Sequence, residues 1–213
     1  MPAPKIKICG LNTASAVEAA IAARADYAGF VFFPPSPRHV SLTLAADLTT
    51  RAEGRIQRVG LFVDADDDTL AEALAAARLD VIQLHGKESP ERAGQIKARF
   101  GLPVWNALAI ACADDVAKAG AYTGAADLIL FDAKTPKGAL PGGMGLSFDW
   151  TLLAGFKGAL PWGLAGGLTP DNVGEAARLT GAALLDTSSG VESAPGVKED
   201  SLIAAFCAAA RTT

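Results

Sequence analysis

Strand-like and helix-like segments alternate along the whole chain, and this order restricts the possible folds more than any single motif does. The strand-like segments are short and mostly apolar, as in sheets that are buried on both faces. They lie at 5–10, 27–33, 57–63, 80–86, 103–110, 127–133, 161–168 and 182–190. Helix-like segments follow them at 14–25, 43–52, 66–79, 89–100, 113–120, from about 147, 170–180 and 198–210. Strict alternation predicts right-handed crossovers and a parallel sheet.

Eight such units within 213 residues favour a closed (β/α)8 TIM barrel with eight surrounding helices. An open, doubly wound sheet is the alternative architecture. No linker, low-complexity tract or change in composition divides the chain. We therefore expect one domain over residues 1–213.

Charge and hydrophobicity restrict the possible partners. Half of the residues are hydrophobic, the net charge is −4, and Lys and Arg form no cluster. Duplex nucleic acid is not expected as a partner, because neutralising phosphates requires grouped Lys and Arg. A small anionic ligand stays compatible with the composition, since one pocket can be positive on an acidic protein.

Three widely spaced cysteines form neither a disulfide framework nor a zinc-binding pattern, so no metal site is predicted. We expect Cys112 and Cys207 to be small apolar side chains in Ala-rich helices. The first ten residues lack the apolar stretch of a secretory signal, and no window approaches the ~18 apolar residues of a membrane span. These features predict a cytoplasmic protein without membrane contact.

Chemically useful side chains collect where the predicted strands end. In a barrel, these carboxyl ends form the rim that carries the active site. The residues at this rim are Cys9, Gln83, His85, Asn106, Asp132, Gly166, Gly167, Asp186, Thr187, Ser188 and Ser189. A thiol, carboxylates and a histidine at one rim indicate an enzyme.

Two loops of small residues close the seventh and eighth predicted strands. They contain Gly166-Gly167 and Ser188-Ser189. Glycines let backbone N–H groups approach an anion, and barrel enzymes often bind phosphate at this position. Ordinary turns and helix caps would use the same residues, but both loops occur at the usual phosphate position. We therefore predict a phosphate site.

Arg38 follows the second predicted strand in a loop with three prolines. Prolines stiffen a chain, so this loop can hold a guanidinium ready for a carboxylate. The alternative is a solvated surface arginine, because charged side chains are mostly exposed. Gln83 and His85 share a parity on the fourth strand, so both are expected to point into the barrel and to contribute to substrate binding. A lone inward histidine is more often structural than catalytic, and His85 is expected to form a pocket wall.

The first strand, Lys5–Gly10, ends in a thiol. Period-two alternation places Lys7 and Cys9 on the same inner face. A lysine beneath the thiol favours the thiolate, which becomes an effective base if its pKa falls below the ordinary ~8.5. An inert packed thiol is the other interpretation.

Together these motifs resemble the phosphoribosylanthranilate isomerase family of tryptophan biosynthesis. The likeness runs from about Lys5 to Lys198 and rests on motifs at successive strand ends: "KICG", "GFVFFPPSPRHVS", "VGLFV", "VIQLHG", "LILFDA", "GGMGLSFDW", "LAGGLTPDNV" and "LDTSSGVESAPGVKE". Three positions depart from the family pattern: Met144 replaces the usual Thr, Thr187 replaces an apolar residue, and the fifth strand lacks a lysine that is often present.

The resemblance implies an Amadori rearrangement of a phosphoribosyl-anthranilate without metal or organic cofactor. It implies that Cys9 is the general base and Asp132 the general acid, and that Arg38 meets the anthranilate side of the substrate. It also implies that the Gly166-Gly167 and Ser188-Ser189 loops bind the phosphate, and that Asp186 contributes to the pocket. A monomer or a homodimer is compatible with these expectations.

Two other functions are considered. The analogous isomerase of histidine biosynthesis has paired aspartates at the ends of strands one and five, whereas this chain has Cys9 and Asn106. A non-catalytic sensor of phosphorylated metabolites would keep the phosphate loops but not need both Cys9 and Asp132.

Overall fold

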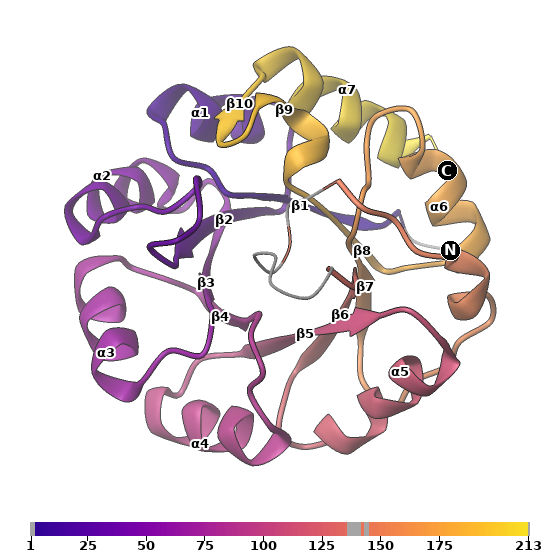
Figure 1. The fold of residues 1–213 in the computed structure, drawn as a ribbon. Coiled ribbons are helices and arrows are strands. Elements are labelled where there is room, and N and C mark those ends of the chain that lie inside the picture. The colour runs from indigo at the N-terminus through magenta and orange to yellow at the C-terminus, as the bar shows by residue number, and fades with distance from the viewer. Residues whose placement is uncertain (1–2, 136–141, 143–144, 213) are drawn as a thin grey trace.

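Eight parallel strands close into a barrel in the order β1 to β8, with helices around the outside (Figure 1). This computed structural model describes residues 3–135, 142 and 145–212. Met144 and the preceding Gly143 lie outside these residues. The strands are Lys5–Cys9 (β1), Tyr27–Phe32 (β2), Gln57–Phe62 (β3), Val81–Leu84 (β4), Val104–Ile110 (β5), Leu128–Ala133 (β6), Trp162–Leu164 (β7) and Leu184–Thr187 (β8). The predicted TIM barrel is confirmed, and the open sheet is excluded.

The helices follow the predicted order but are fewer. Within the described ranges, the α-helices are Ala14–Ala22 (α1), Leu42–Ala52 (α2), Asp67–Ala76 (α3), Pro90–Phe100 (α4), Ala113–Ala117 (α5), Val173–Thr180 (α6) and Asp200–Arg211 (α7). The helix expected from about 147 is a 3-10 turn, Trp150–Leu153 (η2), and α5 continues as a second 3-10 turn, Lys118–Tyr122 (η1). The expectation of eight regular helices is therefore corrected to seven in this part of the chain.

Side-chain caps explain where several helices begin. The Ser89 hydroxyl accepts from the backbone N–H of Arg92 at 3.3 Å, and Pro90 occupies the first turn of α4. Asp66 caps α3 through the backbone N–H of Thr69 at 2.8 Å. Each cap satisfies a backbone donor that the helix itself cannot pair.

The hydrophobic core has two parts, because alternate residues of each strand face opposite sides. Outward side chains such as Ile6, Ile8 and Phe30 pack between the barrel and the helices. Inward side chains fill the barrel, with Val59, Trp105 and neighbours in its lower part. Cys9, Val31 and Leu61 form a small upper cluster, with Phe33 and Val63 against it.

Three aspartates stabilise the amino-terminal end of the barrel. Asp26, Asp80 and Asp127 each precede an even-numbered strand and accept a backbone N–H from the odd-numbered strand before it, at 2.8–2.9 Å. Each also pairs with a cation: Lys5, Arg58 or Lys97. The amino-terminal end of the barrel therefore holds the strands in register, as is usual for this fold.

A β-hairpin that the sequence did not predict separates β8 from α7. After the 3-10 turn Ser189–Val191 (η3), strands Glu192–Ala194 (β9) and Val197–Lys198 (β10) pair antiparallel. Pro195-Gly196 forms the connection, and Gly196 has φ +81°, as position i+2 of a type II turn requires.

No helix in the described residues is long and apolar enough to span a membrane. Among the same residues, no group of three or more His, Cys, Asp or Glu side chains is arranged to hold a metal ion. Cys207 is buried as expected. Cys112 is exposed, because it precedes α5 at the cap position instead of lying inside the helix.

Candidate active site

A cavity of about 740 Å³, including its open mouth, lies at the carboxyl ends of the strands. Its lining contains most of the residues that the sequence singled out: Cys9, Arg38, His85, Asp132, Gly166, Gly167, Asp186, Ser188 and Ser189. Residues from the two ends of the chain thus meet at one rim, as the barrel prediction required.

Cys9 lies at the tip of β1, and its side chain points into the barrel beside Gly29 of β2. A Cβ at Gly29 would approach the Cys9 Sγ to 3.0 Å and the Lys7 Cε to 3.2 Å. Glycine at this position therefore makes room for both inward side chains of β1. The sequence analysis missed Gly29, although its place in "YAGF" opposite Cys9 is the signal that could have identified it.

Lys7 lies one layer below Cys9 and is fully buried. Its ammonium donates to both carboxylate oxygens of Asp186 on β8, at 3.0 and 2.9 Å. Burial alone would lower the pKa of Lys7, but Asp186 and Cys9 hold it above its ordinary value. Burial raises the pKa of Asp186, and Lys7 opposes that effect. Asp186 thus lines the pocket and is the counter-ion of the lysine.

Burial raises the pKa of the Cys9 thiol above its ordinary value. Lys7 acts in the predicted direction and favours the thiolate, and Lys198 does so more weakly. The two lysines do not outweigh the cost of burying a charge, and Asp186 adds to that cost. Without substrate, the thiol form is therefore favoured. The pKa of Cys9 is not lowered in the way that a ready base would require.

Asp132 lies on β6 and faces the cavity together with His85. The His85 Nε2 lies 3.0 Å from one Asp132 carboxylate oxygen, and the backbone N–H of Ala133 donates to the other at 2.8 Å. The carboxylate is held in place from both sides.

Gln83 lies beneath His85, fully buried, with its Nε2 3.1 Å from the His85 Nδ1. When the Gln83 amide donates to Nδ1, this nitrogen is an acceptor. The proton of a neutral imidazole is then on Nε2, which faces Asp132. The shared inward parity of the two residues is confirmed. Gln83 contacts His85 but does not line the cavity.

Arg38 is held by Glu192 of β9. The guanidinium donates from Nε at 2.8 Å and from Nη2 at 2.7 Å to the two carboxylate oxygens. This carboxylate belongs to the protein, so the expected contact of Arg38 with a substrate carboxylate stays a prediction. The alternative of a solvated surface arginine is wrong, because Arg38 is 8% exposed.

Gly10 lets the Arg38 side chain cross over the end of β1. Gly10 has φ +77°, and a Cβ there would approach the Arg38 Cδ to 2.7 Å. The glycine is therefore needed for the backbone turn and for the path of the arginine stem.

The two loops of small residues border the cavity after β7 and β8. Gly166 and Gly167 have φ +85° and +65°, and a Cβ on Gly167 would approach the backbone of Leu146 to 2.9 Å. The Ser188 hydroxyl donates to the Cys9 carbonyl at 3.1 Å, so its proton is already used. Ser189 begins the short turn η3 beside it.

Asn106 does not lie at the rim, contrary to the sequence interpretation. Strand β5 continues to Ile110, so Asn106 is in the middle of the strand, paired with Leu84 and Ile129. The predicted strand, 103–110, already contained the apolar run "ALAI" that follows Asn106, so its end was right and only the rim placement of Asn106 was wrong.

Two charged residues of the site were also missed: Glu192 and Lys198. They lie on the hairpin after β8, where the sequence suggested only a loop before the last helix. Regular pairing across Pro195-Gly196 would place Lys198 opposite Ser193, and a register shift in the hairpin places it opposite Glu192 instead, so no sequence signal marked this pair.

Known proteins resemble this chain over nearly its whole length. Residues 6–209 match the family model "N-(5'phosphoribosyl)anthranilate (PRA) isomerase". The N-(5'-phosphoribosyl)anthranilate isomerase of Paramagnetospirillum magneticum is 55% identical over 208 residues, which cover 97% of each chain.

Two solved structures share the barrel. The phosphoribosyl anthranilate isomerase of Thermotoga maritima has a TM-score of 0.86 at 31% identity, covering 99% of this chain and 100% of that one. A phosphoribosyl anthranilate isomerase in complex with reduced 1-(o-carboxyphenylamino)-1-deoxyribulose 5-phosphate has a TM-score of 0.84 at 29% identity, with the same coverage. The chain therefore belongs to the N-(5'-phosphoribosyl)anthranilate isomerase family.

Proposed function

We propose that this chain converts N-(5'-phosphoribosyl)anthranilate into 1-(o-carboxyphenylamino)-1-deoxyribulose 5-phosphate in tryptophan biosynthesis. The observation that carries the proposal is the presence of Cys9 and Asp132 on one cavity whose rim also holds the two glycine- and serine-rich loops. A base, an acid and an anion site are the three elements that an Amadori rearrangement of a phosphosugar needs.

Asp132 is the general acid in the first step. Its proton goes to the ring oxygen of the ribose, the bond from that oxygen to C1' breaks, and C1' forms a protonated Schiff base with the anthranilate nitrogen. A general acid must hold a proton when the ring opens. His85, 3.0 Å away, is placed to exchange one with it.

Cys9 is the general base in the second step. The Schiff base acidifies the C2' hydrogen, the sulfur removes that proton, and the electron pair forms the C1'–C2' double bond of an enolamine. Tautomerisation protonates C1' and leaves a ketone at C2'. The raised pKa of Cys9 implies that the thiolate is a minor form before the cationic intermediate arises.

The rest of the pocket binds the ends of the substrate. Backbone N–H groups of the Gly166-Gly167 loop and of the Ser188-Ser189 turn are proposed to bind the phosphate. The Ser189 hydroxyl is the better of the two serine donors, because the Ser188 proton is used by Cys9. Arg38 is proposed to meet the anthranilate carboxylate, and Gln83 acts through His85.

The reaction is redox neutral and moves only protons, so the proposed scheme requires no metal or organic cofactor. We propose one catalytic domain over 1–213 that acts in the cytoplasm as a monomer or homodimer.

The histidine-pathway isomerase is a weaker candidate, because strand one ends in Cys9 and strand five ends in Ile110. A sensor without catalysis is also weaker, since the proposed acid and base both face the cavity.

Turnover of freshly generated N-(5'-phosphoribosyl)anthranilate tests the proposal. The substrate is made in place from anthranilate and an activated phosphoribose, and its fluorescence is followed after the protein is added. We expect rapid enzyme-dependent loss of the signal, and no acceleration by a Cys9→Ser/Asp132→Asn double variant. Equal rates for the two proteins would refute the proposed function.

A further inference from the structure

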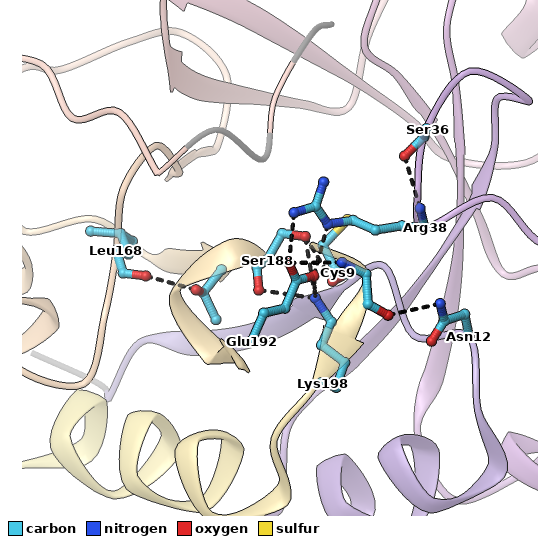
Figure 2. Close-up of polar contacts among 10 residues, drawn as sticks. Cys9, Asn12, Ser36, Arg38, Leu168, Ser188, Glu192 and Lys198 are labelled. Carbon is cyan, nitrogen blue, oxygen red and sulfur yellow. Dashed lines mark hydrogen bonds and ion pairs between the residues drawn. The ribbon is translucent and has the colours of Figure 1, made fainter. Parts of the chain in front are cut away.

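The hairpin after β8 places one carboxylate between two cations. Glu192 accepts from both Nε and Nη2 of Arg38, at 2.8 and 2.7 Å, and from the Lys198 ammonium at 2.6 Å. Lys198 and Glu192 are cross-strand neighbours of β10 and β9. The three side chains form one connected group, shown in Figure 2.

This group is almost completely shielded from water. The side chains of Glu192 and Lys198 are 3% and 1% exposed, and that of Arg38 is 10% exposed. Burial would raise the pKa of Glu192, but Arg38 and Lys198 hold it below its ordinary value. Burial lowers the pKa of Lys198, which Glu192 opposes. Charges buried in this way are costly unless their geometry is fixed.

The group is also connected to the loop that follows Cys9. Lys198 donates to the carbonyl of Ser188 at 2.9 Å, and the Ser188 hydroxyl donates to the carbonyl of Cys9 at 3.1 Å. A continuous series of polar contacts therefore runs from Arg38 through Glu192, Lys198 and Ser188 to Cys9 (Figure 2).

The hairpin rests on the two loops beside it. Asn12, just after β1, donates from Nδ2 to the Gly196 carbonyl at 3.0 Å. A side chain at Gly196 would collide with the Pro37 carbonyl, next to Arg38. The backbone N–H of Gly196 in turn donates to Glu192 at 3.2 Å. The hairpin is thus tied to the loop that carries the arginine.

We propose that Glu192 and Lys198 are positioning residues for the isomerase reaction, which hold the Arg38 guanidinium at a fixed place relative to Cys9 so that it receives the substrate carboxylate. The inference rests on the proposed function and adds residues to which the sequence and the resemblance gave no role.

The geometry favours positioning over a purely structural role. Glu192 engages the Nε edge of the guanidinium, and Figure 2 shows one terminal nitrogen of Arg38 directed away from Glu192. A planar guanidinium that is held along one edge keeps a single orientation. An arginine without such a partner would have to lose several rotamers each time substrate binds.

Binding of two stable ligands tests the inference without relying on turnover. The first is reduced 1-(o-carboxyphenylamino)-1-deoxyribulose 5-phosphate, and the second is the same compound without the carboxyl group. For Glu192→Gln we expect Kd for the first ligand to rise roughly tenfold or more, the usual effect of losing a charge-assisted contact. Kd for the second ligand should stay unchanged.

Asp80→Asn is the matched control. Asp80 holds Arg58 through the same fork, at 2.9 Å from both Nε and Nη2, but at the amino-terminal end of the barrel. This variant should bind both ligands as the wild type does. A carboxylate-selective loss in Glu192→Gln that is absent from Asp80→Asn supports positioning, and equal effects on both ligands overturn it.

If Glu192→Gln does not fold, a double variant allows the same binding test. Glu192→Gln/Lys198→Met removes the negative and the positive charge together, so neither is left buried without the other. It should show the same carboxylate-selective loss of binding. Wild-type affinity for both ligands in the double variant would overturn the inference. Failure of the wild type to turn over substrate would instead contradict the proposed function.

Discussion

At the scale of single residues, two glycines of the site leave room for longer side chains. Gly29 makes room for Cys9 and Lys7, and Gly10 makes room for Arg38. Burial of the thiol, which this close packing causes, sets its protonation state more strongly than the nearby lysine does.

The pH dependence of kcat/KM should report the buried thiol. A base is active only when deprotonated, and the pKa of Cys9 in the free enzyme is above its ordinary value. We therefore expect kcat/KM to rise with pH through the alkaline range. Lys7→Met, which removes the main charge that favours the thiolate, should move this rise to still higher pH. A rise complete below pH 7 would contradict the assignment.

Gly10→Ala should weaken substrate binding by displacing Arg38. The new methyl group would lie where the arginine stem passes, 2.7 Å from its Cδ. Gly101→Ala is the control, because Gly101 has a similar φ of +68° with no atom near the added carbon. Both variants should lose roughly 1–2 kcal/mol of stability from backbone strain. Only Gly10→Ala should raise KM, measured by steady-state kinetics.

At the scale of elements, function is concentrated in the connections after the strands. The loops after β7 and β8 border the cavity, and the hairpin β9–β10 supplies the partner of Arg38. The sequence predicted the two loops because glycines and serines mark them directly. The hairpin was not predictable in the same way, because its strands are only three and two residues long. Strands this short carry no periodic signal.

Gly167→Ala should weaken phosphate binding. Its φ of +65° is strained for alanine, and the added carbon would approach the Leu146 backbone to 2.9 Å. We expect a KM increase larger than the decrease in kcat, and weaker competitive inhibition by inorganic phosphate. Gly181, which caps the carboxyl end of α6, also has a positive φ, +67°, and no atom lies near an added carbon there, so Gly181→Ala is the control. If the two variants bind phosphate alike, the anion site lies elsewhere.

At the scale of the whole molecule, the two ends of the barrel have different tasks. The amino-terminal end carries the aspartates that hold strands in register, and the carboxyl end carries the cavity. The sequence predicted the closed barrel because eight alternating units leave few other topologies. Rim positions were less predictable: the predicted strand 103–110 ends where β5 ends, at Ile110, but Asn106, its only polar residue, was taken for a rim residue.

Asp127→Ala should lower stability without changing catalysis. It leaves the backbone N–H of Val104 and the Lys97 ammonium without their acceptor. The expected loss is about 1–3 kcal/mol of unfolding free energy, from urea denaturation. The exposed Asp171, changed to alanine, should lose much less. A fall in kcat/KM with unchanged stability would contradict this division of the barrel.

The division of labour between Cys9 and Asp132 is tested most directly by an isotope effect. The substrate is deuterated at C2', the carbon that loses its proton, and kcat is compared with that of the unlabelled substrate. Removing an acid or a base typically slows a reaction by ~10²–10⁴-fold, so both variants should be slow. Cys9→Ser should show a primary isotope effect, because proton removal limits it, whereas Asp132→Asn should show almost none, because ring opening limits it. The opposite pattern, or near-wild-type kcat in Cys9→Ser, would contradict the proposed roles of the two residues.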